Sequence, residues 1–159
     1  MVALEALERI PFFNEFDQEE RKLLASISES RSFKAGETIF EEGATAGRLQ
    51  VLVSGLVSLR QKQKGAGTDA LLGTLDENAD VFGIGAALGD KQTHSHSAIC
   101  LEASEVVEID ADRLLALCEE NPRVGVHFLL RLTGVMAQRL AAAREQIRSR
   151  VRPGLISHG

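Results

Sequence analysis

The sequence predicts a mainly β fold flanked by helices, because glycine-punctuated apolar runs fill its middle and helical patterns fill both ends. Between about residues 30 and 110, short runs rich in valine, isoleucine and leucine alternate with glycines at intervals that suit tight turns. This stretch shows no alternation of strands with helices of the βαβ kind. Regularly spaced short strands with glycine turns are typical of a β-sandwich or a barrel.

Length and composition indicate one globular domain spanning residues 1–159. A chain of this size buries about 70% of its extended surface without a disulfide or a metal. Cys100 and Cys118 lack CxxC spacing, so we interpret both as small buried residues of a protein in a reducing compartment. Glu5 and Glu8 interrupt the apolar N-terminal stretch, which argues against a signal peptide or a membrane span. We therefore expect a cytoplasmic protein.

Both ends of the chain carry helix signals. Asp17 is placed to cap the stretch DQEERKLLASI, so residues 1–29 are predicted to form short helices that pack as a lid on the β region at residues 30–110. Asp110 or Asp112 is the expected cap of a further helix, and Asn121 with Pro122 marks a break before a long helix. The two closing helices occupy residues 111–150, and residues 151–159 form a tail.

The clearest predicted hairpin is QVLVSGLVSLRQK, which covers residues 50–62. Val51 and Val53 alternate with their neighbours, Gly55 supplies the turn, and Val57 and Leu59 continue the alternation in a second run.

The long closing helix carries two apolar lines on different sides. One line can face the β region while the other faces a partner, so we predict a homodimer; the alternative is a single wide core stripe. Glu145 is the only acid after Asn121, whereas arginines are frequent, which fits either a solvated face or a surface for an acidic partner. The net charge of −5 disfavours non-specific nucleic-acid binding. The predicted dimer contacts are Leu129, Leu132, Met136 and Leu140.

The run AGETIFEEGATAGRLQVLVSGLVSL, residues 35–59, resembles the strand-turn-strand signature of the cyclic-nucleotide-binding domain superfamily, the sensor half of Crp/Fnr-type regulators. The resemblance implies a double-stranded β-helix, also called a β-roll or jelly roll, with N-terminal helices and a long C-terminal helix. It implies a regulatory sensor and not an enzyme. A full regulator would continue into a helix-turn-helix domain, whereas this sequence stops soon after Arg152, so we expect no direct DNA binding.

The same resemblance implies a phosphate-binding cassette at residues 82–98. In the family this cassette reads Phe-Gly-Glu, a short helix, then an arginine followed by serine or alanine. Ile84 stands here in place of the glutamate and His94 in place of the arginine, so a cyclic nucleotide is possible but disfavoured, and the ligand stays unknown. The candidate ligand-binding residues are Phe82, Gly83, Ile84, Gly85, Ala86, His94, Ser95 and His96.

Metal and catalytic interpretations of this stretch are weak. His94 and His96 alternate along a predicted strand and could hold a metal with His127, but no carboxylate or cysteine stands beside them, so we predict no metal site. Ser95 lacks an acid partner. The sequence thus predicts a regulatory small-ligand sensor that acts as a dimer. The alternatives are a protein-interaction or dimerisation domain with a degenerate pocket, and the excised sensor half of a Crp/Fnr-type regulator.

Overall fold

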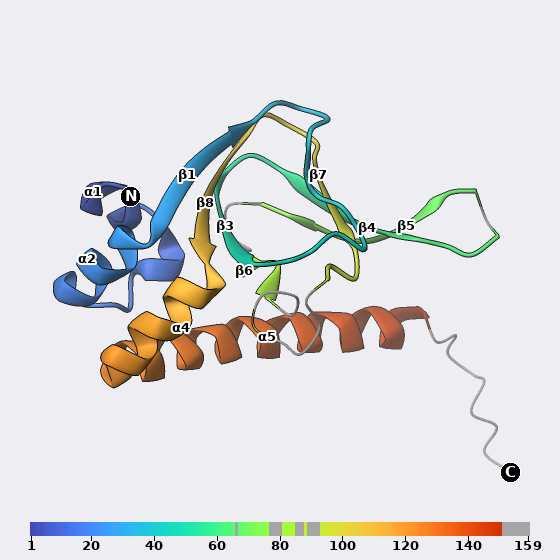
Figure 1. The fold of residues 1–159 in the computed structure, drawn as a ribbon. Coiled ribbons are helices and arrows are strands. Elements are labelled where there is room, and N and C mark those ends of the chain that lie inside the picture. The colour runs from blue at the N-terminus through green and yellow to red at the C-terminus, as the bar shows by residue number, and fades with distance from the viewer. Residues whose placement is uncertain (66, 77–80, 85–87, 89–92, 151–159) are drawn as a thin grey trace, which may run out of the picture.

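The protein, seen here in a computed structural model that describes residues 1–65, 67–76, 81–84, 88 and 93–150, folds as a β-roll with helices on one side (Figure 1). Two antiparallel sheets of four strands each form the roll. The short N-terminal helices pack beside one sheet, and a long helix runs beneath the roll. The predicted mainly β fold with flanking helices is confirmed. The predicted tail at residues 151–159 lies outside the described residues.

The N-terminal helices begin as the sequence predicts. Asp17 caps α2 by accepting a hydrogen bond from the backbone N–H of Glu20, and the Glu20 side chain accepts one from the backbone N–H of Asp17 in return. This capping box satisfies two backbone donors that the first turn leaves without partners. The elements of this region are α1 (Leu4–Glu8), the 3-10 helix η1 (Pro11–Phe13) and α2 (Gln18–Ser26).

The strands divide between two sheets. The first sheet has the order β1-β8-β3-β6, and the second has the order β2-β7-β4-β5. The strands are β1 (Ser28–Phe33), β2 (Thr38–Phe40), β3 (Arg48–Ser54), β4 (Val57–Lys62), β5 (Asp69–Leu75), β6 (Val81–Phe82), β7 (Ser97–Cys100) and β8 (Ser104–Asp110).

The predicted hairpin across Gly55 is wrong. Strands β3 and β4 do form at the predicted residues, but β3 pairs with β6 and β8, whereas β4 pairs with β5 and β7. The chain therefore crosses from one sheet to the other at Gly55, where φ is +105°. Alternation along a strand fixes which side chains face the core, but it leaves the neighbouring strand undetermined.

Two apolar clusters lie on opposite faces of the first sheet. Leu49, Val51 and Val107 pack against the helices. A group of aromatic rings joins this cluster, and in it the ring centroids of Phe12 and Phe128 are 5.5 Å apart. The other face of the sheet lines the interior of the roll, where Leu52 packs within the second cluster. The helices are thereby fixed to the sheet that also forms one wall of the roll.

The last two helices follow the predicted break. Asp110 is the cap of α4 (Ala111–Glu120), since its carboxylate accepts a hydrogen bond from the backbone N–H of Arg113. α5 (Pro122–Arg150) then runs without interruption for 29 residues. No helix in the described part of the chain is both long and apolar enough to span a membrane.

α5 buries one side and leaves the other free. Val124, Phe128, Leu132 and Val135 pack into the core cluster against the roll and the N-terminal helices. The assignment of Leu132 to a dimer contact line is therefore wrong, because Leu132 follows Phe128 by four residues and shares its core-facing side.

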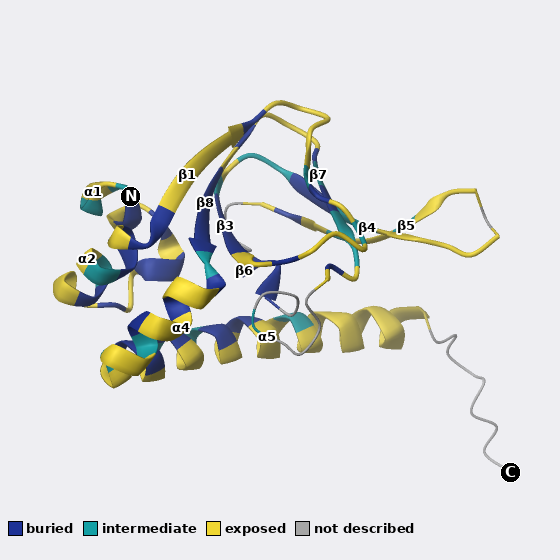
Figure 2. Cartoon of the chain, viewed as in Figure 1, coloured by how far each residue is buried: buried dark blue, intermediate teal, exposed yellow. Residues whose placement is uncertain are grey.

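Leu129, Met136 and Leu140 lie on the outward side, each more than half exposed. Every residue from 140 to 150 is exposed, as Figure 2 shows.

Candidate functional site

The stretch that resembles a phosphate-binding cassette begins at the end of β6. Phe82 is buried in the cluster inside the roll, and Gly83 follows with φ at +74°. A Cβ on Gly83 would lie 2.5 Å from Oε1 of Gln50 and 3.3 Å from the carbonyl oxygen of Arg48. Both the positive φ and the crowding require glycine here.

Ile84 is part of the packed core. It is buried and belongs to the cluster between the sheet and the helices. A carboxylate in this position would lose its hydration, which is unfavourable unless it gains a partner. Gly85 and Ala86, the other candidates in this turn, lie outside the described residues.

His94 is buried and stacked on Phe40. Its ring lies nearly parallel to that of Phe40, at 9°, with the ring centroids 3.7 Å apart. Its backbone is held firmly, because its N–H donates to the carbonyl of Ala44 and its carbonyl accepts from the N–H of Gly43. Nδ1 of the ring is buried and has no hydrogen-bond partner among the residues that the structure describes.

The environment of His94 keeps its ring neutral. Burial lowers the pKa of His94 below its ordinary value, and the charge that His96 would carry lowers it further. A neutral imidazole lacks both the charge and the planar fork with which arginine pairs a phosphate. At neutral pH His94 therefore cannot replace an arginine as an anion partner.

Ser95 and His96, which follow His94 and precede β7, are less buried than His94. The Ser95 side chain is exposed and lies 3.2 Å from Nδ1 of His96, and its carbonyl accepts a hydrogen bond from Gln61. His96 meets the edge of Phe40 with the ring centroids 5.6 Å apart. Its Nε2 is buried and meets no hydrogen-bond partner in the described part of the chain. Burial lowers the pKa of His96, and the charge of Arg139 on α5 acts in the same direction.

The structure gives the three histidines considered as metal ligands different partners: His94 and His96 contact Phe40, whereas His127 contacts Glu20. His127 lies on α5, where its Nδ1 is 2.6 Å from Oε2 of Glu20 on α2. Within the described ranges, no group of three or more histidine, cysteine, aspartate or glutamate side chains is close enough to hold a metal ion.

A cavity of about 230 Å³ lies next to the stacked rings. Gln50 on β3 contributes to its wall, and Oε1 of Gln50 is buried with no partner among the described residues. The described lining residues are Arg31, Ile39, Phe40, Thr45, Gly47, Arg48, Gln50, His94, Glu108 and Asp110.

Glu108 is a buried carboxylate held between two arginines. Its Oε1 lies 3.0 Å from Nη1 of Arg31, and its Oε2 lies 2.7 Å from Nη1 of Arg48. Hydrogen bonding to Glu108 raises the pKa of Arg48. Both guanidinium groups are about half exposed, so they keep N–H groups that face solvent. Sequence reasoning missed this trio, although a glutamate within the apolar run VVEID was a signal of a buried charge.

α5 touches the start of the cassette directly. Nη2 of Arg139 donates a hydrogen bond to the carbonyl oxygen of Val81 on β6. The long helix thus contacts the strand that leads into Gly83.

Comparison with known proteins identifies the family of this fold and site. The family model of the cyclic nucleotide-binding domain matches residues 30–121. The chain belongs to this family. None of the curated proteins matches the sequence.

Solved structures of cyclic nucleotide-binding domains resemble the whole chain. One from Methylobacillus flagellatus superimposes with a TM-score of 0.79 at 21% identity, over 96% of this chain and 84% of that one. A putative cyclic nucleotide-binding protein from Geobacter metallireducens has a TM-score of 0.74 at 27% identity, over 88% and 99% of the two chains. The catabolite activator protein of Thermus thermophilus has a TM-score of 0.70 at 28% identity, over 87% and 62%. The domain is therefore similar to the sensor domains of Crp/Fnr-type regulators.

The structure places the candidate residues of this stretch in different surroundings. Ile84 packs into the cluster between the first sheet and the helices, whereas His94 stacks on Phe40 beside the cavity. Gly83 forms a turn with positive φ at the end of β6.

Proposed function

We propose that this domain is a regulatory sensor that binds a small ligand in an atypical pocket and signals as a homodimer. The observation that carries this proposal is the cavity of about 230 Å³ beside the stacked rings of His94 and Phe40, with a neutral His94 where the family places a phosphate-binding arginine. Without Glu and Arg in the cassette, affinity for a cyclic nucleotide is expected to fall at least about a hundredfold. The role is one of binding and not of catalysis.

The outward side of α5 supports signalling through a dimer. Leu129, Met136, Leu140 and Ile147 are each more than half exposed. Together with Val126, Thr133 and Ala143 they recur at alternating steps of three and four residues, which is the spacing of a coiled-coil seam. Since this helix also reaches β6 through Arg139, a ligand at the roll has a route to the dimer contact.

A protein-interaction or dimerisation domain with a degenerate pocket is the second candidate. The close packing of His94 on Phe40 favours it, because the ring fills space that a ligand could occupy. A third possibility is that the chain is the sensor half of a longer Crp/Fnr-type regulator.

Mass spectrometry of the denatured purified protein tests the first candidate against the second. A small molecule released in stoichiometric amount supports the sensor, and calorimetry with cyclic AMP on the same sample should detect weak binding or none. A dimer from which no small molecule is released, and whose unfolding temperature does not change across a metabolite panel, supports the interaction domain.

A further inference from the structure

The imidazole of His94 stacks on one face of the Phe40 ring. Aromatic pairs usually settle into offset or edge-to-face arrangements with centroids about 4.5–7 Å apart. Here the two rings lie at 9° with centroids only 3.7 Å apart, so the imidazole covers the Phe40 face almost completely. His94 is 5% exposed, so the face of Phe40 that it covers is closed to solvent.

His94 gains little hydrogen bonding from this position. Among the described residues, Nδ1 is buried without a partner, which is unusual for a polar atom inside a native protein. Oε1 of Gln50 and Nε2 of His96 are likewise buried with no partner in the described part of the chain. Gln50 lines the 230 Å³ cavity with Phe40 and His94, and His96 meets the edge of Phe40. When the His94 ring moves out to water, Nδ1 is hydrated, and a molecule that stacks on Phe40 in its place brings N–H or acceptor groups toward Gln50 and His96.

The cavity favours a ligand without net charge. Among the described residues, its lining carries two arginines, Arg31 and Arg48, and two acids, Glu108 and Asp110. Glu108 bonds both guanidinium groups, and Asp110 caps α4, so the charges are already matched. An ionised ligand would face both signs, whereas a neutral ring needs only hydrogen bonds and the Phe40 face.

We propose that His94 occupies the binding place of an uncharged planar nitrogen heterocycle, which displaces the imidazole and stacks on Phe40. The inference rests on the proposed function, in which this pocket holds a small ligand. It makes His94 a competitor of the ligand and not one of its contacts. Removing the imidazole should consequently tighten binding, whereas removing a contact residue would weaken it.

The first test replaces His94 and restores its ring in solution. His94→Gly should bind free imidazole at least tenfold more tightly than the wild type at pH 8.5, measured by the rise in unfolding temperature. Tetrahydrofuran, of similar size but not planar, is the matched probe and should have little effect. His94→Phe keeps the face covered and should not respond, and Phe40→Leu combined with His94→Gly should abolish the response. His94→Ala serves the same comparison if the glycine variant does not fold.

The second test uses the unaltered protein. Proton NMR should show the His94 ring resonances displaced by the ring current of Phe40, and adding adenine should move them toward those of an exposed histidine. Adenine that binds without moving these resonances would overturn the proposal. So would a His94→Gly protein that binds adenine less tightly than the wild type, since His94 would then be a contact. Either result leaves the sensor function standing, whereas that function fails by the mass-spectrometric test.

Discussion

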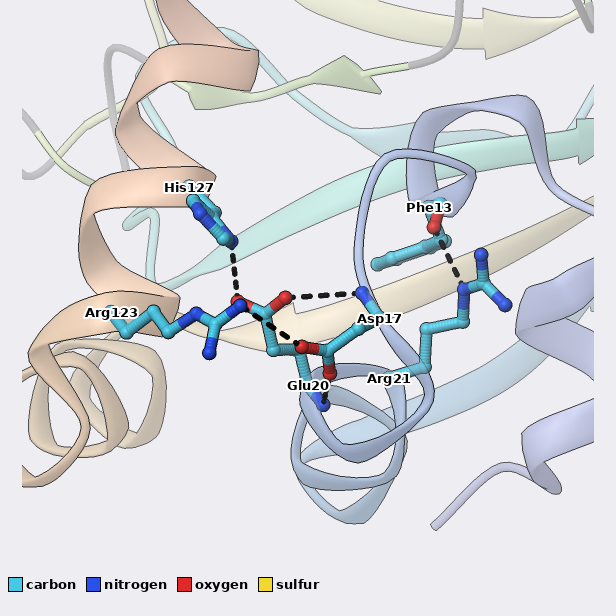
Figure 3. A network of polar contacts seen from close by, with 6 residues as sticks. All are labelled: Phe13, Asp17, Glu20, Arg21, Arg123 and His127. Atoms are coloured by element: carbon cyan, nitrogen blue, oxygen red, sulfur yellow. Dashed lines mark hydrogen bonds and ion pairs between the residues drawn. The ribbon is translucent and has the colours of Figure 1, made fainter.

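Nδ1 of His127 lies 2.6 Å from Oε2 of Glu20, so a side-chain contact joins the long helix α5 to the N-terminal helix α2 (Figure 3). Glu20 is buried and also completes the capping box with Asp17. Arg123, one turn before His127, lies 3.6 Å from the Asp17 carboxylate. The N-terminal helices are thus attached to α5 by polar contacts as well as by the phenylalanine cluster.

Removing His127 should destabilise the fold more than a surface contact does. In His127→Ala the buried Glu20 carboxylate loses one partner, and the expected loss is about 1–3 kcal/mol of unfolding free energy. Urea unfolding of His127→Ala, Glu20→Gln and the double variant gives the coupling between the two residues. Lys22→Ala, which breaks an exposed pair with Glu19, is the matched control and should change little. If the losses of unfolding free energy in the two single variants add up to the loss in the double variant, His127 and Glu20 do not stabilise each other.

Gly55 should be the least replaceable glycine among the strand connections. A Cβ at this position would lie 2.2 Å from Oγ of Ser104 and 2.7 Å from the carbonyl oxygen of Ala103. Gly36 also has positive φ, but a Cβ there would have no other atom within 4 Å. Gly55→Val should therefore lose about 3 kcal/mol or more, against about 1–2 kcal/mol for Gly36→Val. Equal unfolding temperatures for the two variants would show that crowding at the crossover between sheets is unimportant.

The fold class could be predicted because it rests on local signals. Glycines, caps and apolar periodicity lie within a few residues of the structure they specify, and Asp17 and Asp110 became helix caps as expected. The hairpin prediction failed because strand pairing is a property of distant segments. Gly55 has the sequence context of a turn between paired strands, yet β3 pairs with β8 and not with β4.

Only those parts of the candidate site that lie close together in the sequence could be predicted. The resemblance to the family predicts a site at Gly83, Ile84 and His94, but nothing in the sequence indicated that Phe40 would stack on His94. Glu108 and its two arginines come from three strands that meet only in the folded sheet. Leu132 was misassigned because two apolar lines on one helix do not reveal which of them the core covers.

Acidification should destabilise the wild type through His94 and His96. Burial lowers the pKa of both His94 and His96, so the unfolded chain, with an ordinary histidine pKa of about 6.5, takes up protons first. The stabilisation is complete above about pH 6.5 and is lost as the pH falls through the lower pKa values of the folded state. Urea unfolding at pH 7.5, 6.5 and 5.5 should show this decline.

The variant His94→Phe with His96→Gln is the control for that titration. It removes both imidazoles while keeping a ring on Phe40, so its stability should fall less steeply below about pH 6.5 than that of the wild type. Parallel curves for the two proteins would mean that other groups account for the pH dependence.

Charges on the outward side of α5 should separate the predicted dimer. Met136→Glu or Leu140→Glu places a carboxylate at a symmetric apolar seam, where each subunit would bury a charge without a partner. Sedimentation velocity at tens of micromolar should show a dimer for the wild type and monomers for these variants. Leu132→Ala, on the core side, should instead lose about 2–5 kcal/mol of stability and remain dimeric. A monomeric wild type would refute the interface.

Restoring the two charged side chains of the cassette should restore recognition of a cyclic nucleotide. Ile84→Glu supplies an acceptor for a ribose hydroxyl, and His94→Arg supplies the fork for the phosphate while vacating the Phe40 face. Calorimetry should show cyclic AMP binding at least a hundredfold tighter than in the wild type, which corresponds to about 3 kcal/mol. His94→Arg alone should give part of this gain, since it restores only the phosphate partner.

The burial of Ile84 adds a second readout to this prediction. A glutamate within the core cluster loses hydration, so the double variant should unfold at a lower temperature than the wild type when no nucleotide is present. Cyclic AMP gives that carboxylate a hydrogen-bond donor and should recover part of the lost stability through binding linkage. The wild type should show neither the loss nor the recovery. Sub-micromolar binding of cyclic AMP by the wild type, unchanged between pH 6 and pH 8, would mean that groups other than a glutamate and an arginine recognise the nucleotide here.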